Sequence, residues 1–137
     1  MTTQILDRNE CMRLLASQQV GRLAVVAGHY PLVVPVNFVL EHGSVMFRSA
    51  AGVKLEASSH RNVSFQVDEI DVVRRRGWSV LLTGFAEIVT DRSRGLPIEP
   101  FDEHAAVHWV RISTHDVSGR RITPADFVSP LDDRGYL

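Results

Sequence analysis

Short runs of β-branched and aromatic residues constrain the fold of this sequence more than any other feature. Each run has the length of a single strand, and Gly-containing turns separate the first three. These runs do not alternate regularly with long helices. The sequence therefore predicts that the strands pair antiparallel and do not form a parallel sheet. The strand candidates are VGRLAVVA (20–27), LVVPVNFVL (32–40), VMFRS (45–49), NVSFQV (62–67), WSVLLTGFAEIVT (78–90) and HWVRIS (108–113), the last leading on to Ile122.

The longest candidate, residues 78–90, is apolar on both faces. Alternation puts Trp78, Val80 and Leu82 on one face and Leu81, Phe85 and Val89 on the other. A barrel of this size covers only one face of such a strand, so the other face is expected to pack on a second subunit. Gly84 permits a bend or a bulge within the strand. In residues 32–40, Pro35 cannot donate to a ladder and indicates an edge, a bulge or a place of close approach.

Helices are expected to be few and short. Asp7 and Glu10 form a capping box for a helix that ends near Gln18, and a second short helix is predicted to begin near Val53. Residues 28–30 and the adjoining Pro31 are interpreted as a turn, residues 91–106 as loop, and EHAAV (103–107) as a helical turn. These elements predict a single domain over residues 1–137, a mainly β, six-stranded antiparallel barrel of Greek-key type with short flanking helices.

Composition excludes several functional classes. The chain has 137 residues and a formal net charge of −1, with no basic face or charged tail that would favour nucleic acid. Cys11 is the one cysteine, so no internal disulfide can form, and a buried inert thiol is expected. The apolar runs are too short to span a bilayer, and no leader segment is indicated. These features predict a cytoplasmic protein with neither a nucleic-acid nor a membrane partner.

The stretch FRSAAGVKLEA (47–57) combines three groups that suit a phosphate. Arg48 offers a bidentate fork, Ser49 a hydroxyl, and Lys54 a point charge in the first turn of the expected helix. The alternative is that Arg48 and Lys54 are solvated surface charges, as such residues usually are. Spacing alone leaves both interpretations open.

The order of segments around this stretch carries a resemblance to a known family. LLASQQVGRLAVV, PLVVPVNFVLEHGSVMFRSAAGVKLEAS, NVSFQVDEID, GWSVLLTGFAEIV and HWVRISTHDVSGRRI follow one another over residues 5–122. The chain thereby resembles the pyridoxamine 5′-phosphate oxidase-like family of FMN-binding split β-barrel proteins. It looks closest to the small actinobacterial-type branch, and it is similar also to nitroimidazole-resistance proteins.

The resemblance implies a homodimer with FMN in clefts between the subunits. Arg48, Ser49 and Lys54 would hold the FMN phosphate, and the strand bearing Val34, Pro35, Val36 and Asn37 would run beside the isoalloxazine. Trp78 and Ser79 would contact the flavin across the dimer. The true oxidases carry an Arg-Gln pair near this position, and they read the substrate phosphate through a basic C-terminal extension. Trp-Ser in place of that pair makes oxidation of pyridoxamine phosphate doubtful and leaves the substrate unnamed.

We therefore expect an FMN-binding flavoprotein, and an oxidoreductase that cycles the flavin with a nicotinamide donor or another small-molecule electron donor. One alternative is a deazaflavin-dependent reductase on the same fold, in which Arg74–Arg76 would be the only basic cluster for the coenzyme tail. A second alternative is a non-catalytic flavin carrier or sequestering protein.

Three further features are given simpler interpretations. His104 and His108 stand four residues apart with no third ligand, so they are taken as surface or interface residues and no metal is expected. Arg74–Arg76 favour a solvated loop over an anion-attracting patch. Trp109 and Arg111 fit either the flavin pocket and dimer seam or simple packing.

Overall fold

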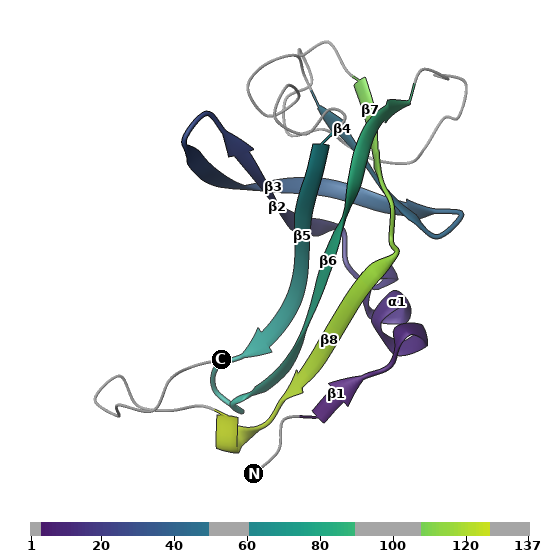
Figure 1. Cartoon of the computed structure of the whole chain (residues 1–137). Coiled ribbons are helices and arrows are strands. Elements are labelled where there is room, and N and C mark those ends of the chain that lie inside the picture. Colours follow the sequence, from purple (N-terminus) through teal and green to yellow (C-terminus); the bar gives the residue numbers. More distant parts are fainter. Residues whose placement is uncertain (1–3, 50–60, 90–107, 127–137) are drawn as a thin grey trace.

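The structure is a computed structural model that describes residues 4–49, 61–89 and 108–126. Within them the chain forms one α-helix, one 3-10 turn and strands that all pair antiparallel (Figure 1). The elements are β1 (Gln4–Leu6), α1 (Arg8–Ala16), β2 (Val20–Ala27), β3 (Tyr30–Glu41), β4 (Ser44–Ser49), β5 (Arg61–Asp71), β6 (Arg76–Val89), β7 (His108–Ile112), β8 (Asp116–Ile122) and η1 (Pro124–Asp126).

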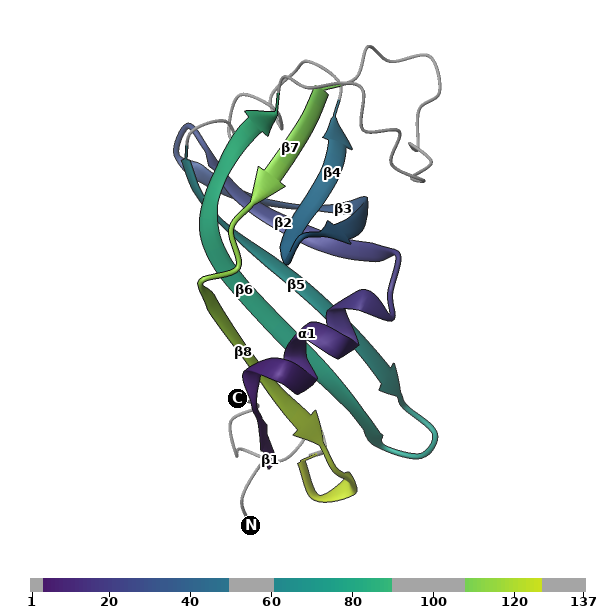
Figure 2. The ribbon, with the colours of Figure 1, turned by 90° about the vertical axis from the view of Figure 1, so that its right-hand side faces the viewer.

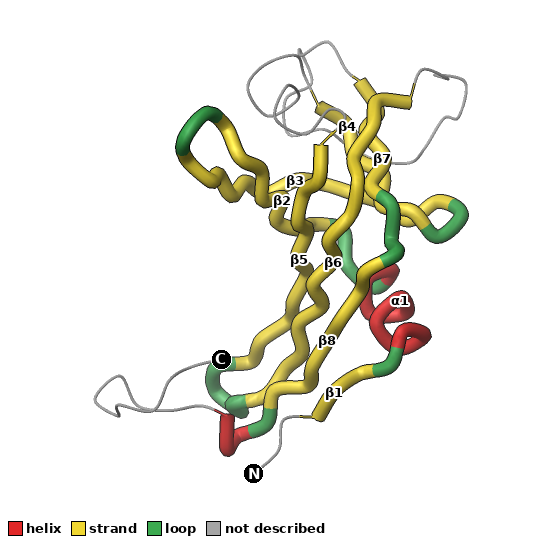
Figure 3. The backbone as a smooth tube through the Cα atoms, in the orientation of Figure 1, coloured by secondary structure: helices red, strands yellow, loops and turns green. Residues whose placement is uncertain are grey.

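Six of these strands close into a barrel. The strand order is β6-β5-β2-β3-β4-β7, and β7 pairs back onto β6 to complete the ring. The two remaining strands, β8 and β1, extend the sheet beyond β6 (Figure 3). The predicted six-stranded antiparallel barrel is confirmed, and closure pairs β7, which would otherwise be an exposed edge strand, with β6.

The barrel splits where β6 changes partners. Residues Gly77 to Thr83 of β6 pair with β8, whereas Ala86 to Val89 pair with β7. Gly84 lies at this change, and a Cβ there would collide with the carbonyl oxygen of Ser113. The nitrogen of Phe85 donates to Ser113 Oγ at 3.3 Å, which ties the crossing chain to β6. The expected bend at Gly84 is therefore the point from which the two halves diverge.

The core fills the inner face of the ring. On β6 the side chains of Trp78, Val80, Leu82 and Ala86 are buried, and Val63, Phe65 and Val67 of β5 face them. Phe65 packs edge-on against Phe38 of β3, with ring centroids 5.0 Å apart. The alternation predicted for β5 and for this face of β6 is confirmed.

Helix α1 packs against the lower part of the sheet, in front of β6 and β8 (Figure 2). Asp7 caps it by accepting the N–H of Glu10 at 2.8 Å, as the sequence predicted. Cys11 is buried, and burial raises the pKa of its thiol, so the inert role expected for it is supported. A Cβ on Gly119 of β8 would stand 2.6 Å from Cys11 Sγ, so the missing side chain lets α1 approach.

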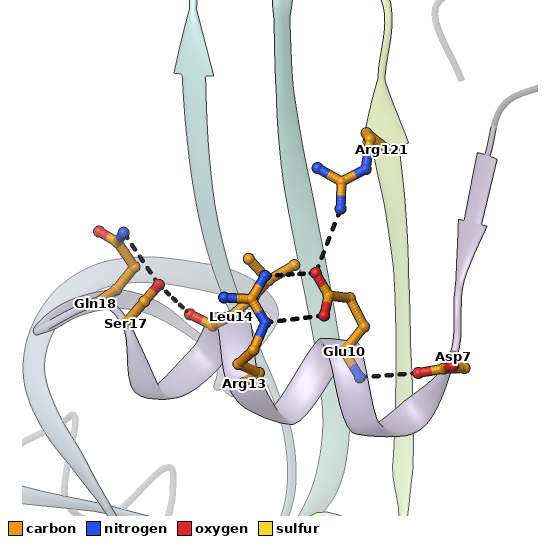
Figure 4. A network of polar contacts seen from close by, with 7 residues as sticks. All are labelled: Asp7, Glu10, Arg13, Leu14, Ser17, Gln18 and Arg121. Carbon is orange, nitrogen blue, oxygen red and sulfur yellow. Dashed lines mark hydrogen bonds and ion pairs between the residues drawn. The ribbon is translucent and has the colours of Figure 1, made fainter.

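An ion-pair network fastens α1 to β8 (Figure 4). Glu10 accepts from Arg13 one turn along the helix and from Arg121 Nη2 at 3.3 Å. The hydrogen bond from Arg13 is the main cause that lowers the pKa of Glu10, and Arg121 adds to it. This carboxylate thus joins two elements more than a hundred residues apart in sequence.

Several boundaries differ from the sequence-based expectations. β3 begins at Tyr30, so Tyr30 and Pro31 belong to the strand, while Gly28 takes the positive φ of 64° in the turn. β5 runs on to Asp71 because pairing with β6 supplies partners that local propensity cannot. The last predicted strand is two strands, β7 and β8, because each pairs with a different part of β6.

Other expectations fall at the margins of the described chain. Helix α1 ends at Ala16, two residues before the expected Gln18, and the sequence analysis missed β1, which adds to β8. The helix expected from Val53 and the helical turn at 103–107 lie outside the described residues. Among the helices in the described part of the chain, none is long and apolar enough to cross a membrane.

Candidate functional site

The upper outer surface of the barrel gathers the polar residues singled out from sequence. The register pairs Phe38 of β3 with Phe47 of β4, so one residue further along Asn37 lies opposite Arg48. Arg48 in turn pairs across the ladder with Trp109 of β7. Because side chains alternate along a strand, these three share the outer face while Phe38 and Phe47 fill the core.

Arg48 is held against an aromatic ring. Its guanidinium carbon lies 5.6 Å from the centroid of the Trp109 ring, within the range of a cation–π contact. Trp109 is itself buried with Met46, and Val39 and Val89 pack around them as a small outer cluster separate from the core. The Trp109 ring therefore orients Arg48, for which the sequence had left open the interpretation as a solvated surface charge.

Next to this cluster, Arg111 and Glu87 form an ion pair between β7 and β6. Both side chains are partly exposed. Glu87 gives the Arg111 guanidinium an ion-pair partner within the sheet, which favours the packing interpretation of Arg111. The sequence analysis gave Trp109 and Arg111 the same two alternatives, but the structure gives them different contacts. Trp109 contacts Arg48, whereas Arg111 links β7 to β6.

The predicted phosphate residues do not all point the same way. Ser49 is buried and lies opposite His108 of β7, on the opposite side of β4 from the Arg48 side chain. The described chain therefore brings only the backbone of Ser49 beside Arg48. Lys54, the third predicted phosphate ligand, lies outside the described residues.

The first half of β3 forms an open edge within the described chain. Residues 30–37 pair with β2, whereas pairing with β4 begins at Phe38. The N–H of Phe38 donates to Gln19 on the β2 side, so by alternation the nitrogens of Pro31 and Pro35 point away from β2. Both prolines thus sit where no ladder bond is lost, and the edge interpretation of Pro35 is confirmed.

The four residues predicted beside the isoalloxazine divide between two faces. Val36 is buried in the core and Val34 packs against it, so their side chains support the barrel. Pro35 and Asn37 face outward, toward the surface that carries Arg48. The contribution expected from Val34 and Val36 is therefore limited to their backbone groups.

Trp78 and Ser79 also divide between faces. Trp78 is buried on the inner face, whereas Ser79 faces outward between Asp68 of β5 and Arg120 of β8. Strands β5 and β2 separate β6 from β3, which amounts to about 14 Å across the sheet. Within one chain, three strand spacings therefore lie between Ser79 and β3.

Exposed apolar side chains extend over the outer face of the same sheet. Leu81 is 46% exposed and Phe85 44%, and Val33 of β3 is 64% exposed. Val20 and Val26 of β2 lie on this face as well. As expected, the barrel covers one apolar face of β6 and leaves the other exposed within the chain. The exposed side chains on the outside of β2, β3 and β6 will be called the outer apolar face: Val20, Val26, Val33, Leu81 and Phe85.

Sequence reasoning did not recognise the placement of His108 and Trp109 beside β4. No local motif around His108 and Trp109 indicates this placement. The contact arises from the register between β4 and β7, which lie about sixty residues apart in sequence. A strand-end Arg paired with an aromatic residue on another strand is visible only once the ladder is known. In the ranges that the structure describes, no three His, Cys, Asp or Glu side chains come together as a metal site would require.

Comparison with known proteins identifies the family. The model of the pyridoxamine 5′-phosphate oxidase family matches residues 7–121, and the chain belongs to that family. The family resemblance drawn from the sequence motifs is confirmed. The name describes the family, and the substrate of this chain is a separate question.

Three relatives illustrate the likeness. The FAD binding protein from Mycobacterium smegmatis is 33% identical, with a TM-score of 0.74 over 90% of this chain and 99% of that one. An FAD-binding protein from Mesorhizobium loti is 28% identical, with a TM-score of 0.73 over 90% and 98%. The uncharacterized protein Rv0080 from Mycobacterium tuberculosis is 38% identical over 92 residues, which are 63% of this chain and only 60% of that protein.

Proposed function

We propose that this protein binds a flavin nucleotide along the open edge of β3 and uses it as an oxidoreductase at a homodimer interface. The observation that carries the proposal is the guanidinium of Arg48, held over Trp109 beside the outward-facing Asn37 and Pro35. The family and the FAD-binding relatives support it.

The residues present fit such a cofactor. An oriented guanidinium suits a phosphate, because its planar fork can donate two parallel hydrogen bonds to phosphate oxygens. The backbone of residues 30–37 has no second strand among the described elements, so its outward groups can address the polar edge of a planar ring. A bound flavin would supply acceptance and donation of a hydride, and the chain supplies binding and orientation.

A second subunit completes this arrangement. Because Ser79 lies about 14 Å from β3 in its own chain, a partner subunit would bring the Ser79 contact that the resemblance implies closer to a flavin there. The outer apolar face offers two exposed apolar groups on which that partner would pack, one on β6 and one on β2 and β3, with the polar outward residues of β5 between them. The homodimer and the flavin site are therefore one proposal with two tests.

FMN is the cofactor that the sequence motifs imply, and FAD is a second candidate because two relatives are named as FAD-binding proteins. Both carry the phosphate that Arg48 would hold, and riboflavin does not. A deazaflavin coenzyme is the alternative. Its anionic tail would need a basic cluster, and the sequence offers the run Arg74–Arg76.

The binding test compares FMN, FAD and riboflavin by fluorescence titration of the purified protein. A charge-assisted contact contributes about 1.5–3 kcal/mol, so Arg48→Gln and Lys54→Ala should each weaken FMN binding about ten-fold or more. Riboflavin binding should hardly change. Arg13→Gln, an exposed charge on α1, serves as the matched control. Equal losses for FMN and riboflavin would refute the phosphate assignment.

A second experiment separates an enzyme from a flavin carrier. If the ring edge is open beside Pro35 and Asn37, anaerobic mixing with NADH, NADPH or a reduced deazaflavin should bleach the flavin at a rate that saturates with one donor. Bleaching limited by flavin release for every donor would instead establish the carrier. The same panel names the physiological class of reductant.

A further inference from the structure

We propose that a second ligand site, for a small organic anion, lies in a cleft at the opposite end of the molecule from Arg48. The cleft has a volume of about 540 Å³ and opens between the β5–β6 hairpin and the end of β8. Figures 1 and 2 show this end far from the upper ends of β4 and β7. The site does not depend on the proposed flavin function, and its residues are Glu69, Asp71, Arg74, Arg76, Trp78 and Arg121.

The charges in the cleft leave a cationic group available. Asp71 is engaged by Arg74, whose guanidinium lies 3.3 Å away, and its carboxylate also accepts the N–H groups of Val73 and Arg74 at 3.0 Å. Glu69 accepts from Gln18 at 3.1 Å. Both acids of the cleft therefore already have donors.

The basic residues are less fully used. Arg121 places one nitrogen 3.3 Å from Glu10, while the charge of Arg76 acts on Asp71 but its side chain makes no hydrogen bond or ion pair to any residue that the structure describes. Arg74 and Arg121 are each paired with a carboxylate, Asp71 and Glu10, which leaves Arg76 as the arginine of the cleft whose side chain has no ion pair to a described residue. Arginine forks bind carboxylate and phosphate bidentately, so Arg76 and Arg121 are suited to an anionic head group.

The remaining wall suits the body of an organic molecule. Trp78 is only 7% exposed, so it lines the cleft with part of a rigid indole, and Ile122 and Pro124 add apolar surface. Cavities of about 300–1,000 Å³ with an apolar lining and a few polar groups are typical of small-ligand sites. The chemistry points to a carboxylate or phosphate carried on a planar apolar group.

The test uses Trp78 as its own reporter. The chain has two tryptophans, so Trp109→Phe leaves Trp78 as the only one, and its fluorescence can be titrated with phenyl phosphate and with benzoate. Saturable quenching by at least one anion, with none by the neutral benzyl alcohol, is the expected result, and the stronger ligand names the head group. Equal quenching by benzyl alcohol, or no saturation with either anion, would overturn the proposal.

Two neighbouring arginines provide the matched pair. Arg76→Gln should weaken the anion about ten-fold or more, whereas Arg75→Gln, in the adjoining turn and outside the cleft, should change it less than about two-fold. The side chain of Arg76 is exposed and its replacement keeps the backbone pairing with Asp71, so circular dichroism should show an unchanged fold. Calorimetry with the intact protein saturated with FMN should give the same affinity. Similar losses in both variants, or displacement of the anion by FMN, would refute a separate site.

Discussion

The inner and outer faces of β6 differ sharply although they alternate along one strand. Inward, Trp78, Val80, Leu82 and Ala86 are buried against the residues of β5 and β7. Outward, Leu81 and Phe85 are equally apolar, yet each leaves over two fifths of its surface in water. The comparison teaches that one face stabilises the fold, whereas the other is available for association.

The strongest test exchanges one aromatic side chain on each face. Phe65→Ala empties the inner face beside Phe38 and should lower the free energy of unfolding by about 3–5 kcal/mol. Phe85→Ala on the outer face should cost less than about 1 kcal/mol in urea titrations of the dissociated chain, and its main effect should be weaker self-association. Similar losses would show that the two faces do not divide the roles as argued.

The change of partner along β6 is tested at Gly84. Gly84→Ala forces a methyl group against the backbone carbonyl of Ser113, which cannot move without disturbing β7, and should cost about 1–3 kcal/mol by thermal or urea unfolding. Thr83→Ala, one residue earlier on the outer face, is the control; it removes only an exposed hydrogen bond to Asp116 and should cost about 0.5 kcal/mol. A neutral Gly84→Ala variant would mean that the split is more tolerant than its geometry indicates.

The role proposed for the outer apolar face is sharpened by Leu81→Arg. In a symmetric dimer the substitution occurs twice and introduces like charges into a desolvated surface, so self-association should weaken about ten-fold or more. Light scattering over a range of concentrations measures the effect, with circular dichroism showing an unchanged fold. A wild-type chain that is monomeric at micromolar concentration and still binds flavin stoichiometrically would contradict the dimer.

The smallest effect is expected from the carboxylate that joins α1 to β8. The pKa of Glu10 lies below its ordinary value of 4.5, chiefly because Arg13 donates to it. A carboxyl group with a lowered pKa in the folded state contributes stability above its ordinary pKa, and this stability is lost as the pH falls through the folded value. Glu10→Gln should therefore be slightly less stable than wild type near neutral pH, and the difference should vanish in acid. A constant difference across a pH series of melting curves would exclude this linkage.

The local features of the chain could be predicted because their causes are local. The Asp7 cap needs only a side chain three residues before an N–H, and the alternation of Val63, Phe65 and Val67 follows from the period of an extended backbone. The missing donor of Pro35 limited it to an edge, a bulge or a place of close approach, and the structure shows the edge. The family followed from the order of such segments.

Predictions about which side chains meet at the flavin site were weaker, because they assumed that residues adjacent in sequence point to the same place. Arg48 and Ser49 are adjacent, yet the pleat that made the strand predictable turns their side chains to opposite faces, and the same holds for Trp78 and Ser79. Which of each pair can meet a ligand on the outer face depends on how the sheet curves and closes. Lys54 lies beyond the described chain, and its part in the phosphate site stays a prediction.

The sequence by itself determined most of the barrel strands, the helix start and the apolar character of both faces of β6, since each depends on neighbours within a few residues. The order of these segments along the chain determined the family. Only the tertiary structure decided that β6 passes from β8 to β7 at Gly84, that Trp109 lies against Arg48, and that Arg76 and Arg121 line one cleft with Trp78. These contacts join residues far apart in the chain. They are fixed by the register of a closed barrel, a property of all its strands together that no single segment encodes.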